Sequence, residues 1–180
     1  VKGVDKWAQE QGFTIDELAW IQPGYWVTTT ANELSGGVNG QVNAIVVEQG
    51  GMNIYVAGEF NTAGGTVAAN NIAVYQSGFA GWFWMPLNNG VNGKIKTMFV
   101  HNNQIIVGGV FTAANGIPAN HIAVYDLQNS QWQNMGSLDG TVNTIAVFNN
   151  EIYAGGSFTG LLAKWNGSAW IDANQLGFYG

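Results

Sequence analysis

The sequence predicts an all-β protein made of β-propeller blades: about three four-stranded antiparallel blades in an incomplete ring, preceded by a short N-terminal helical segment. The first observation is an apolar sequence motif, called here the repeated phrase, that occurs three times, at residues 54–60, 105–111 and 152–158. Similar turn residues precede each copy, and a tryptophan segment closes each unit. The unit length of roughly 50 residues fits four short strands joined by hairpin loops.

Each unit offers four strands in the same order. The first strands are alternating apolar runs, which are typical of half-buried strands, and they lie at residues 41–47, 94–100 and 141–147. The repeated phrase is the second strand, and the third runs lie at residues 72–75, 122–125 and 162–165. The fourth strands surround Trp84, Trp132 and Trp170, which we interpret as blade-packing residues.

Asparagine–glycine and aspartate–glycine pairs precede the first strands. The three pairs are Asn39-Gly40, Asn92-Gly93 and Asp139-Gly140. Such pairs tolerate positive φ, which predicts type I′ turns here and at Asn166-Gly167. The small pairs within the repeated phrase are Ala57-Gly58, Gly108-Gly109 and Gly155-Gly156, and they indicate close approach between neighbouring blades. None of these glycines precedes a helix in a nucleotide-binding pattern, so we expect no cofactor.

These turns, phrases and closing tryptophans resemble the kelch-like, galactose-oxidase-type propeller repeats of secreted and surface proteins. The resemblance covers residues 34 to 170 and implies adhesion or carbohydrate binding, since only a few members are enzymes. The copper oxidase chemistry of the namesake needs a cysteine-modified tyrosine. This chain has no cysteine, so that activity is not expected.

The N-terminal stretch differs from the repeats. Residues 4–11 and 14–21 predict two short helices, the second with a Thr14/Glu17 capping box. The stretch resembles the helical half of a LysM module, whereas a docking segment that covers a propeller edge is the simpler interpretation. A third interpretation is an entering half-blade, because residues 18–20 and 25–26 echo residues 162–165 and 169–170.

We therefore divide the chain into an N-terminal helical or docking segment, residues 1–33, and propeller repeats, residues 34–180. The repeats span about 37–89, 90–137 and 138–176. The third is the shortest because its loop after Phe158 keeps only Thr159-Gly160. Three blades do not close a ring, so we expect other copies of the chain, or the rest of a longer chain, to supply the missing blades.

Composition favours an extracellular, cell-surface or virion protein. Charged residues are 9% of the chain, and the net charge is −6. All five basic residues are lysines, which argues against nucleic-acid binding. The chain has neither a transmembrane-length apolar stretch nor a recognisable signal peptide. Because it begins with valine, we expect a processed product or an excised part.

No catalytic set emerges from the sequence, so an enzyme is not expected. His121 occupies the position that Asn71 holds in the previous unit, which favours a structural role, and His101 lies in a turn. The acidic residues are dispersed along the chain. The oxygens of Asn39, Asn92 and Asp139 offer an alternative as calcium ligands, although turn formation already explains these residues, and we predict no metal.

Aromatic residues beyond those needed for packing are the candidates for recognition. They are Tyr25, Trp82 and Phe83, whose rings can stack on sugars or anchor a protein partner. We expect a non-catalytic extracellular recognition or adhesion module that binds a glycan or a protein. The alternative is a structural subunit of an extracellular assembly, such as a virion fibre, capsid decoration or filament, whose ring neighbouring chains complete.

Overall fold

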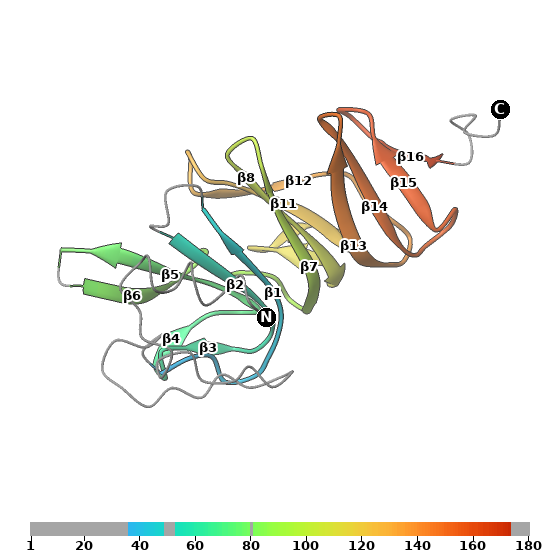
Figure 1. The fold of residues 1–180 in the computed structure, drawn as a ribbon. Coiled ribbons are helices and arrows are strands. Elements are labelled where there is room, and N and C mark those ends of the chain that lie inside the picture. The colour runs from blue at the N-terminus through green and yellow to red at the C-terminus, as the bar shows by residue number, and fades with distance from the viewer. Residues whose placement is uncertain (1–35, 49–52, 80, 174–180) are drawn as a thin grey trace, which may run out of the picture.

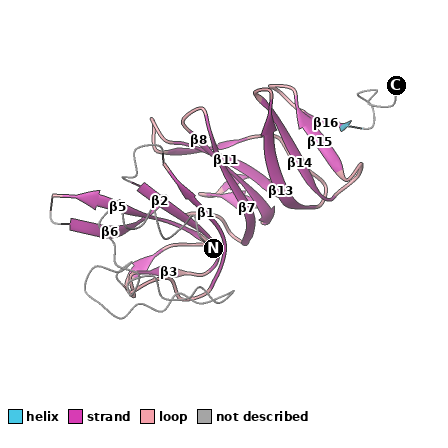
Figure 2. Cartoon of the chain, viewed as in Figure 1, coloured by secondary structure: helices cyan, strands magenta, loops and turns pink. Residues whose placement is uncertain are grey.

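The computed structural model describes residues 36–48, 53–79 and 81–173. Three four-stranded antiparallel sheets follow one another along these residues, and we call them blades 1, 2 and 3. Figure 1 shows the blades side by side, and Figure 2 shows that strands and their connecting loops account for nearly all of the described chain. The all-β fold is as predicted. The predicted helical segment at residues 1–33 lies outside the described residues.

Each blade uses four strands in chain order. Blade 1 consists of β1 (Gln41–Val47), β2 (Asn53–Glu59), β5 (Ile72–Gly78) and β6 (Gly81–Pro86). Blade 2 consists of β7 (Lys94–His101), β8 (Gln104–Val110), β11 (Ile122–Asp126) and β12 (Gln131–Asn134). Blade 3 consists of β13 (Thr141–Phe148), β14 (Glu151–Ser157), β15 (Leu162–Trp165) and β16 (Trp170–Asp172). The first strands β1, β7 and β13 of successive blades are neighbours.

The connection after the second strand carries a small hairpin in two of the blades. In blade 1, β3 (Thr62–Ala63) pairs with β4 (Val67–Ala68), and in blade 2, β9 (Ala113–Ala114) pairs with β10 (Ile117–Pro118). Blade 3 has a tight turn there, in which the Leu161 amide donates to the Phe158 carbonyl at 3.0 Å. The shorter third unit therefore loses part of a connection and keeps all four strands.

Successive residues of the second strand pack against different neighbours. In β8, Ile105 and Val107 belong to the core between blades 1 and 2, whereas Ile106 belongs to the core between blades 2 and 3. This period-two alternation is what strand geometry dictates. Tyr55 of β2 faces blade 2, where burial, together with nearby Glu48, raises the pKa of its phenol to about 12.

Tryptophans tie blade 2 to blade 1 and blade 3 to blade 2. The indole Nε1 of Trp132 in blade 2 donates to the Leu87 carbonyl after blade 1, at 2.9 Å. The indole Nε1 of Trp170 in blade 3 donates to the Met135 carbonyl after blade 2, at 2.7 Å. These contacts confirm the predicted packing role of both tryptophans.

The glycines of the repeated phrase are structural, but they do not all act between blades. A Cβ at Gly108 would lie 2.4 Å from Val142 Cγ1 of blade 3, as the prediction of close blade approach requires. A Cβ at Gly109 would instead lie 2.1 Å from the Lys94 carbonyl oxygen within the same blade. Gly58 and Gly156 face Gln41 and Thr141 in the same way, each beside a β-bulge in the first strand.

The prediction of type I′ turns before the first strands is wrong. The residues of the three pairs at 39–40, 92–93 and 139–140 do not adopt positive φ. Gly40 is required because a Cβ there would lie 2.1 Å from the Glu59 carbonyl oxygen. Positive φ occurs instead in the two-residue hairpin loops Asn102-Asn103 and Asn149-Asn150, with φ of 47° and 62° and of 50° and 63°. At Asn166-Gly167 only the glycine has positive φ.

Among the described residues, no helix has the length and apolar character needed to cross a membrane.

Candidate functional site

The outer hairpin of blade 1 exposes four large apolar side chains. Trp82 is 43% exposed, and Phe83 and Met85 are each 41% exposed, all on β6. Phe79 is fully exposed at the tip. We call these four residues the apolar hairpin. In the described chain β6 pairs only with β5, so it is an edge strand, and Figure 1 shows β5 and β6 projecting beyond the rest of blade 1.

The rings of the apolar hairpin lie on opposite faces of β6. Trp82 stacks on Tyr75 of β5, with ring centroids 5.4 Å apart and planes at 18°. Phe83 lies on the other face over Gly78, where a Cβ would be only 2.4 Å from Phe83 Cε1. The glycine thus leaves room for the phenyl ring. These contacts hold both rings in place while roughly two fifths of each remains open to solvent.

The equivalent positions in blade 2 are polar. Tyr75 pairs with Trp84 in blade 1 as Tyr125 pairs with Trp132 in blade 2, which fixes the alignment of β6 with β12. Ser130, Gln131 and Gln133 therefore stand where blade 1 has Trp82, Phe83 and Met85. The strands of blade 1 are also longer, since β5 has seven residues and β11 has five. A blade folds without these aromatics, so packing of the fold does not account for them.

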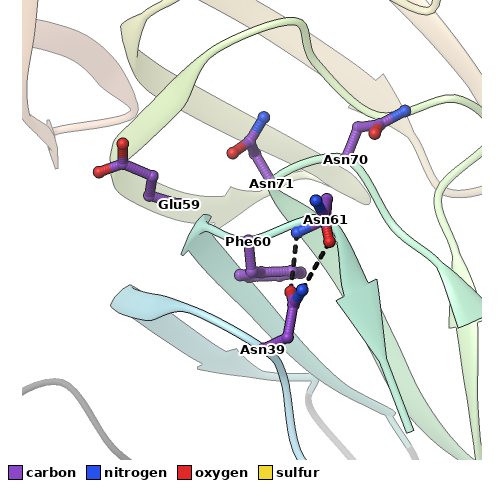
Figure 3. A pocket seen from close by; sticks show the side chains of 6 residues that line it. All are labelled: Asn39, Glu59, Phe60, Asn61, Asn70 and Asn71. Carbon is purple, nitrogen blue, oxygen red and sulfur yellow. Dashed lines mark hydrogen bonds between the residues drawn. The ribbon is translucent and has the colours of Figure 1, made fainter. Parts of the chain in front are cut away.

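Blade 1 also carries a shallow depression of about 290 Å³ near the start of β1 (Figure 3). Its lining residues are Asn39, Glu59, Phe60, Asn61, Asn70 and Asn71. The Nδ2 groups of Asn70 and Asn71 donate to the carbonyls of Asn89 and Val91, at 3.0 and 2.9 Å. Glu59 pairs with Lys94 of blade 2 at 2.8 Å. These polar groups have structural partners, which makes this depression a weaker candidate than the apolar hairpin.

Asn39, Asn92 and Asp139 act as side-chain clamps, by which we mean that a side-chain oxygen of each accepts backbone amide protons from the loop after the second strand. Asn39 Oδ1 accepts the amides of Asn61 and Thr62 at 3.0 and 2.9 Å, and Asn92 Oδ1 accepts the two equivalent amides in blade 2. Figure 3 shows Asn39 directed at Asn61. Because these oxygens already accept amide protons, the geometry does not favour the alternative of calcium ligation. The described residues contain no cluster of three or more metal-ligating His, Cys, Asp or Glu side chains.

The clamp in blade 3 predicts a local dependence of stability on pH. The Thr159 hydroxyl and amide donate to the Asp139 carboxylate, at 2.5 and 2.8 Å, and they hold the pKa of that carboxyl below its usual range. The stabilisation is present above the carboxyl's ordinary pKa and is lost as pH falls through the lower folded pKa. Asp139→Asn, which copies the clamps of blades 1 and 2, is expected to reduce the acid-induced fall in melting temperature, measured by circular dichroism. An unchanged slope below pH 4 would contradict this account.

Both histidines lie in structural positions. His121 has a φ of 67°, as Asn71 has a φ of 66° at the equivalent position, and its carbonyl accepts the Gly109 amide at 3.0 Å. Its ring Nδ1 lies 3.3 Å from the Gly109 carbonyl oxygen. His101 contacts Asn102 at the β7–β8 turn. These contacts support the structural interpretation of both histidines.

The structure places Trp82 and Phe83 on one projecting strand, whereas Tyr25 lies outside the described residues. Sequence reasoning missed Phe79 and Met85. Met85 could have been found by comparing β6 with β12, because the polar residue Gln133 occupies the equivalent position in blade 2. Phe79 has no such signal, since its exposure depends on the length of the hairpin.

The chain is a β-propeller protein in its described part, and comparison with known proteins gives the family. Residues 25–179 match the family model described as the Rax2 C-terminal beta propeller domain, so the chain belongs to this family. This confirms the predicted propeller class. The kelch-like resemblance stays a prediction, as does the LysM-like one.

Two individual proteins are similar to parts of the chain. Polarized growth protein L1 of Phoma sp. is 33% identical over 92 residues, which is 51% of this chain and 7% of that protein. The computationally designed Ika8 protein has a TM-score of 0.47 and 14% identity, over 73% of this chain and 36% of that structure. The matched part is thus a small fraction of the growth protein.

Proposed function

We propose that this chain is a non-catalytic recognition module on the surface of a growing cell, and that the apolar hairpin binds a protein partner. The observation that carries the proposal is the contrast between blades 1 and 2 at equivalent edge positions. Trp82, Phe83 and Met85 replace polar residues there and remain exposed. Solvent-exposed aromatic side chains that the fold does not require are typical of interaction surfaces.

A protein partner suits this surface better than a glycan. Sugar-binding rings usually act together with polar groups that fix the hydroxyls. The neighbours on β6 are Met85 and Pro86. Of the two polar residues opposite on β5, Gln76 already donates to the Met85 sulfur at 3.0 Å, which leaves Ser77 beside Trp82. The edge of β6 also offers main-chain groups for strand addition by an extended peptide. The growth-related name of the Phoma relative and the family match support a surface role. The alternative is that the apolar hairpin binds a glycan, as the kelch-like resemblance implies.

The proposal is tested by measuring how strongly the chain binds to cell envelopes of Phoma sp., the organism of the similar polarized growth protein. The variant Trp82→Ser/Phe83→Gln/Met85→Gln carries the residues of blade 2. Its envelope binding should fall at least tenfold, because a single buried aromatic anchor contributes ~2 kcal/mol or more. The matched control is Gln131→Ala/Gln133→Ala in blade 2, which should bind like the parent chain.

Two further measurements make the binding result interpretable. The melting temperature of the triple variant should stay close to that of the parent, so that lost binding is not lost folding. Protease treatment of the envelopes should abolish binding if the partner is a protein. Hairpin-dependent binding that survives protease but disappears after glucanase or chitinase treatment would indicate a glycan. Equal binding by the parent and the triple variant would refute the proposed surface.

A further inference from the structure

The β15–β16 turn of blade 3 carries the only Asn-x-Ser/Thr triplet of the sequence. Asparagine is abundant in the chain, but Asn166 alone is followed two residues later by a serine or threonine, Ser168. The residue between them is Gly167, rather than the proline that blocks this acceptor sequence. The triplet is therefore a complete acceptor sequence for an N-linked oligosaccharide, which attaches to the asparagine side-chain nitrogen.

The turn offers the space that an oligosaccharide needs. Residues 166–169 are all exposed. A Cβ built on Gly167 would meet no atom within 4 Å beyond its chain neighbours, so the surroundings of the turn are open. An attached oligosaccharide is bulky and hydrated, and the folded blade accommodates it here without any change in its packed strands.

The carboxamide of Asn166 is held by its oxygen, which leaves its nitrogen available. Its Oδ1 accepts the amides of Ser168 and Ala169 at 2.9 and 2.8 Å, which forms an Asx turn. The Ser168 hydroxyl also donates to this oxygen, at 3.1 Å. In the described part of the chain, nothing accepts a hydrogen bond from Asn166 Nδ2. The atom that receives the sugar is thus unengaged, and the hydroxyl of the acceptor sequence lies against the same carboxamide.

Blade 2 shows which of these features the turn itself requires. The residue at the equivalent place, directly after the strand residue that pairs with the blade tryptophan, is Asp126. Its Oδ1 accepts the amides of Gln128 and Asn129 at 2.8 and 3.1 Å. A carboxylate followed by glutamine therefore forms the same kind of turn. The amide nitrogen of Asn166 and the hydroxyl of Ser168 go beyond what turn formation needs.

We propose that Asn166 carries an N-linked glycan, attached as the chain passes through the secretory pathway. The inference rests on the proposed location at the cell surface, because proteins on that route meet the glycosyl transferase. The donor is a lipid diphosphate that carries an oligosaccharide through N-acetylglucosamine. The bond between the anomeric carbon and the diphosphate oxygen breaks, and this carbon forms a bond to Asn166 Nδ2. The lipid diphosphate leaves, and one Nδ2 proton passes to a base of the transferase.

The glycan gives the outer end of each blade a different character. Blade 1 ends in the apolar hairpin, blade 2 ends in polar residues, and blade 3 ends in an oligosaccharide. Because the oligosaccharide is solubilising, the β15–β16 turn faces solvent in any assembly of the chain. Figure 1 shows blade 2 between this turn and β6, so binding by the apolar hairpin does not involve the glycan.

Mass spectrometry of the secreted chain tests the site. The whole chain is secreted by a yeast from a removable signal peptide, and endoglycosidase H trims any N-glycan to one N-acetylglucosamine. Trypsin then cleaves after Lys164, the last basic residue, and releases residues 165–180. This peptide should carry the sugar, a tag that spontaneous deamidation of Asn166-Gly167 does not imitate. Ser168→Ala should abolish the tag, whereas Ser168→Thr should keep it.

A transplanted triplet provides the matched control. Asp126→Asn/Gln128→Ser gives the equivalent turn of blade 2 the same acceptor sequence. This variant should carry a sugar at position 126 in addition to the one at Asn166. Absence of the sugar from Asn166, while position 126 or the host's own secreted glycoproteins are modified, would overturn the proposal. A tag that persists in Ser168→Ala would also contradict it.

Envelope binding separates this inference from the proposed function. Asn166→Asp copies Asp126, keeps the accepting oxygen of the turn and removes the nitrogen that receives the sugar. Its binding to Phoma cell envelopes should equal that of the parent chain. A glycan at Asn166 without hairpin-dependent binding would support the modification site and refute the recognition role. Hairpin-dependent binding by a secreted chain that lacks the glycan would do the reverse.

Discussion

Replacing Trp132 with alanine is expected to lower the free energy of unfolding by about 3–5 kcal/mol. The side chain is 3% exposed and belongs to the core between blades 1 and 2. The substitution opens a cavity there and removes one of the two donors to the buried Leu87 carbonyl, which keeps the hydrogen bond from the Gly90 amide at 3.0 Å. Both effects act on the same interface, so the blades should lose mutual support as well as local packing.

Chemical denaturation followed by tryptophan fluorescence measures this loss. Trp132→Phe keeps most of the apolar volume and removes only the indole donor, so it should cost less, about 0.5–1.5 kcal/mol, and it remains informative if the alanine variant does not fold. Trp82→Ala is the matched control, because its ring is 43% exposed. Equal destabilisation by Trp82→Ala and Trp132→Ala would contradict the assigned roles of the two tryptophans.

Gly109→Ala is expected to be the second severe change, with a loss of about 3 kcal/mol. A Cβ at this position would lie 2.1 Å from the Lys94 carbonyl oxygen and 2.9 Å from the Ile95 Cα. Both atoms belong to the backbone of β7, next to the bulge between Ile95 and Thr97, so a side-chain movement cannot relieve the contact. Relief requires the bulge to open.

The neighbouring glycine provides the comparison for this prediction. Gly108→Ala brings a Cβ against the Val142 side chain, and blade 1 accommodates an alanine, Ala57, at the equivalent position. Gly108→Ala should therefore cost clearly less than Gly109→Ala in the same denaturation experiment. A larger loss of unfolding free energy for Gly108→Ala than for Gly109→Ala would contradict this prediction. It would show that the close approach between blades contributes more to stability than the bulge within one blade.

The sequence was sufficient to predict the blades because three copies of one pattern agree with each other. The alternation at residues 105–107 determines which side chain faces which neighbour, and the structure assigns Ile105 and Ile106 to different cores accordingly. The roles of Trp132 and Trp170 followed from their repeated position, since a residue that recurs in every unit serves the packing that every unit shares.

The turns before the first strands were predicted wrongly because two physical causes favour the same residues. Asparagine followed by glycine suits positive φ, but it equally suits a side-chain clamp next to a close backbone approach. Asn92 binds the amides of Thr112 and Ala113, and Gly93 lies against the Val110 carbonyl. These contacts join segments about 20 residues apart, which a local turn rule does not consider.

The candidate site was only partly accessible from sequence for a similar reason. Trp82 and Phe83 stood out because they exceed what packing needs. Their exposure depends on the projection of the β5–β6 hairpin and on the space that Gly78 leaves for the phenyl ring. Met85 becomes informative only when β6 and β12 are aligned through their strand pairing.

Site-specific photocrosslinking tests the central claim most directly, namely that the exposed β6 edge of blade 1, which differs from the equivalent edge of blade 2, carries recognition. A photoreactive phenylalanine analogue replaces Phe83 in one sample and the equivalent Gln131 of blade 2 in another. On Phoma cell envelopes, position 83 should crosslink to a protein of discrete mass, and position 131 should not. Equal crosslinking at both positions, or binding without any crosslink at position 83, would contradict the proposal.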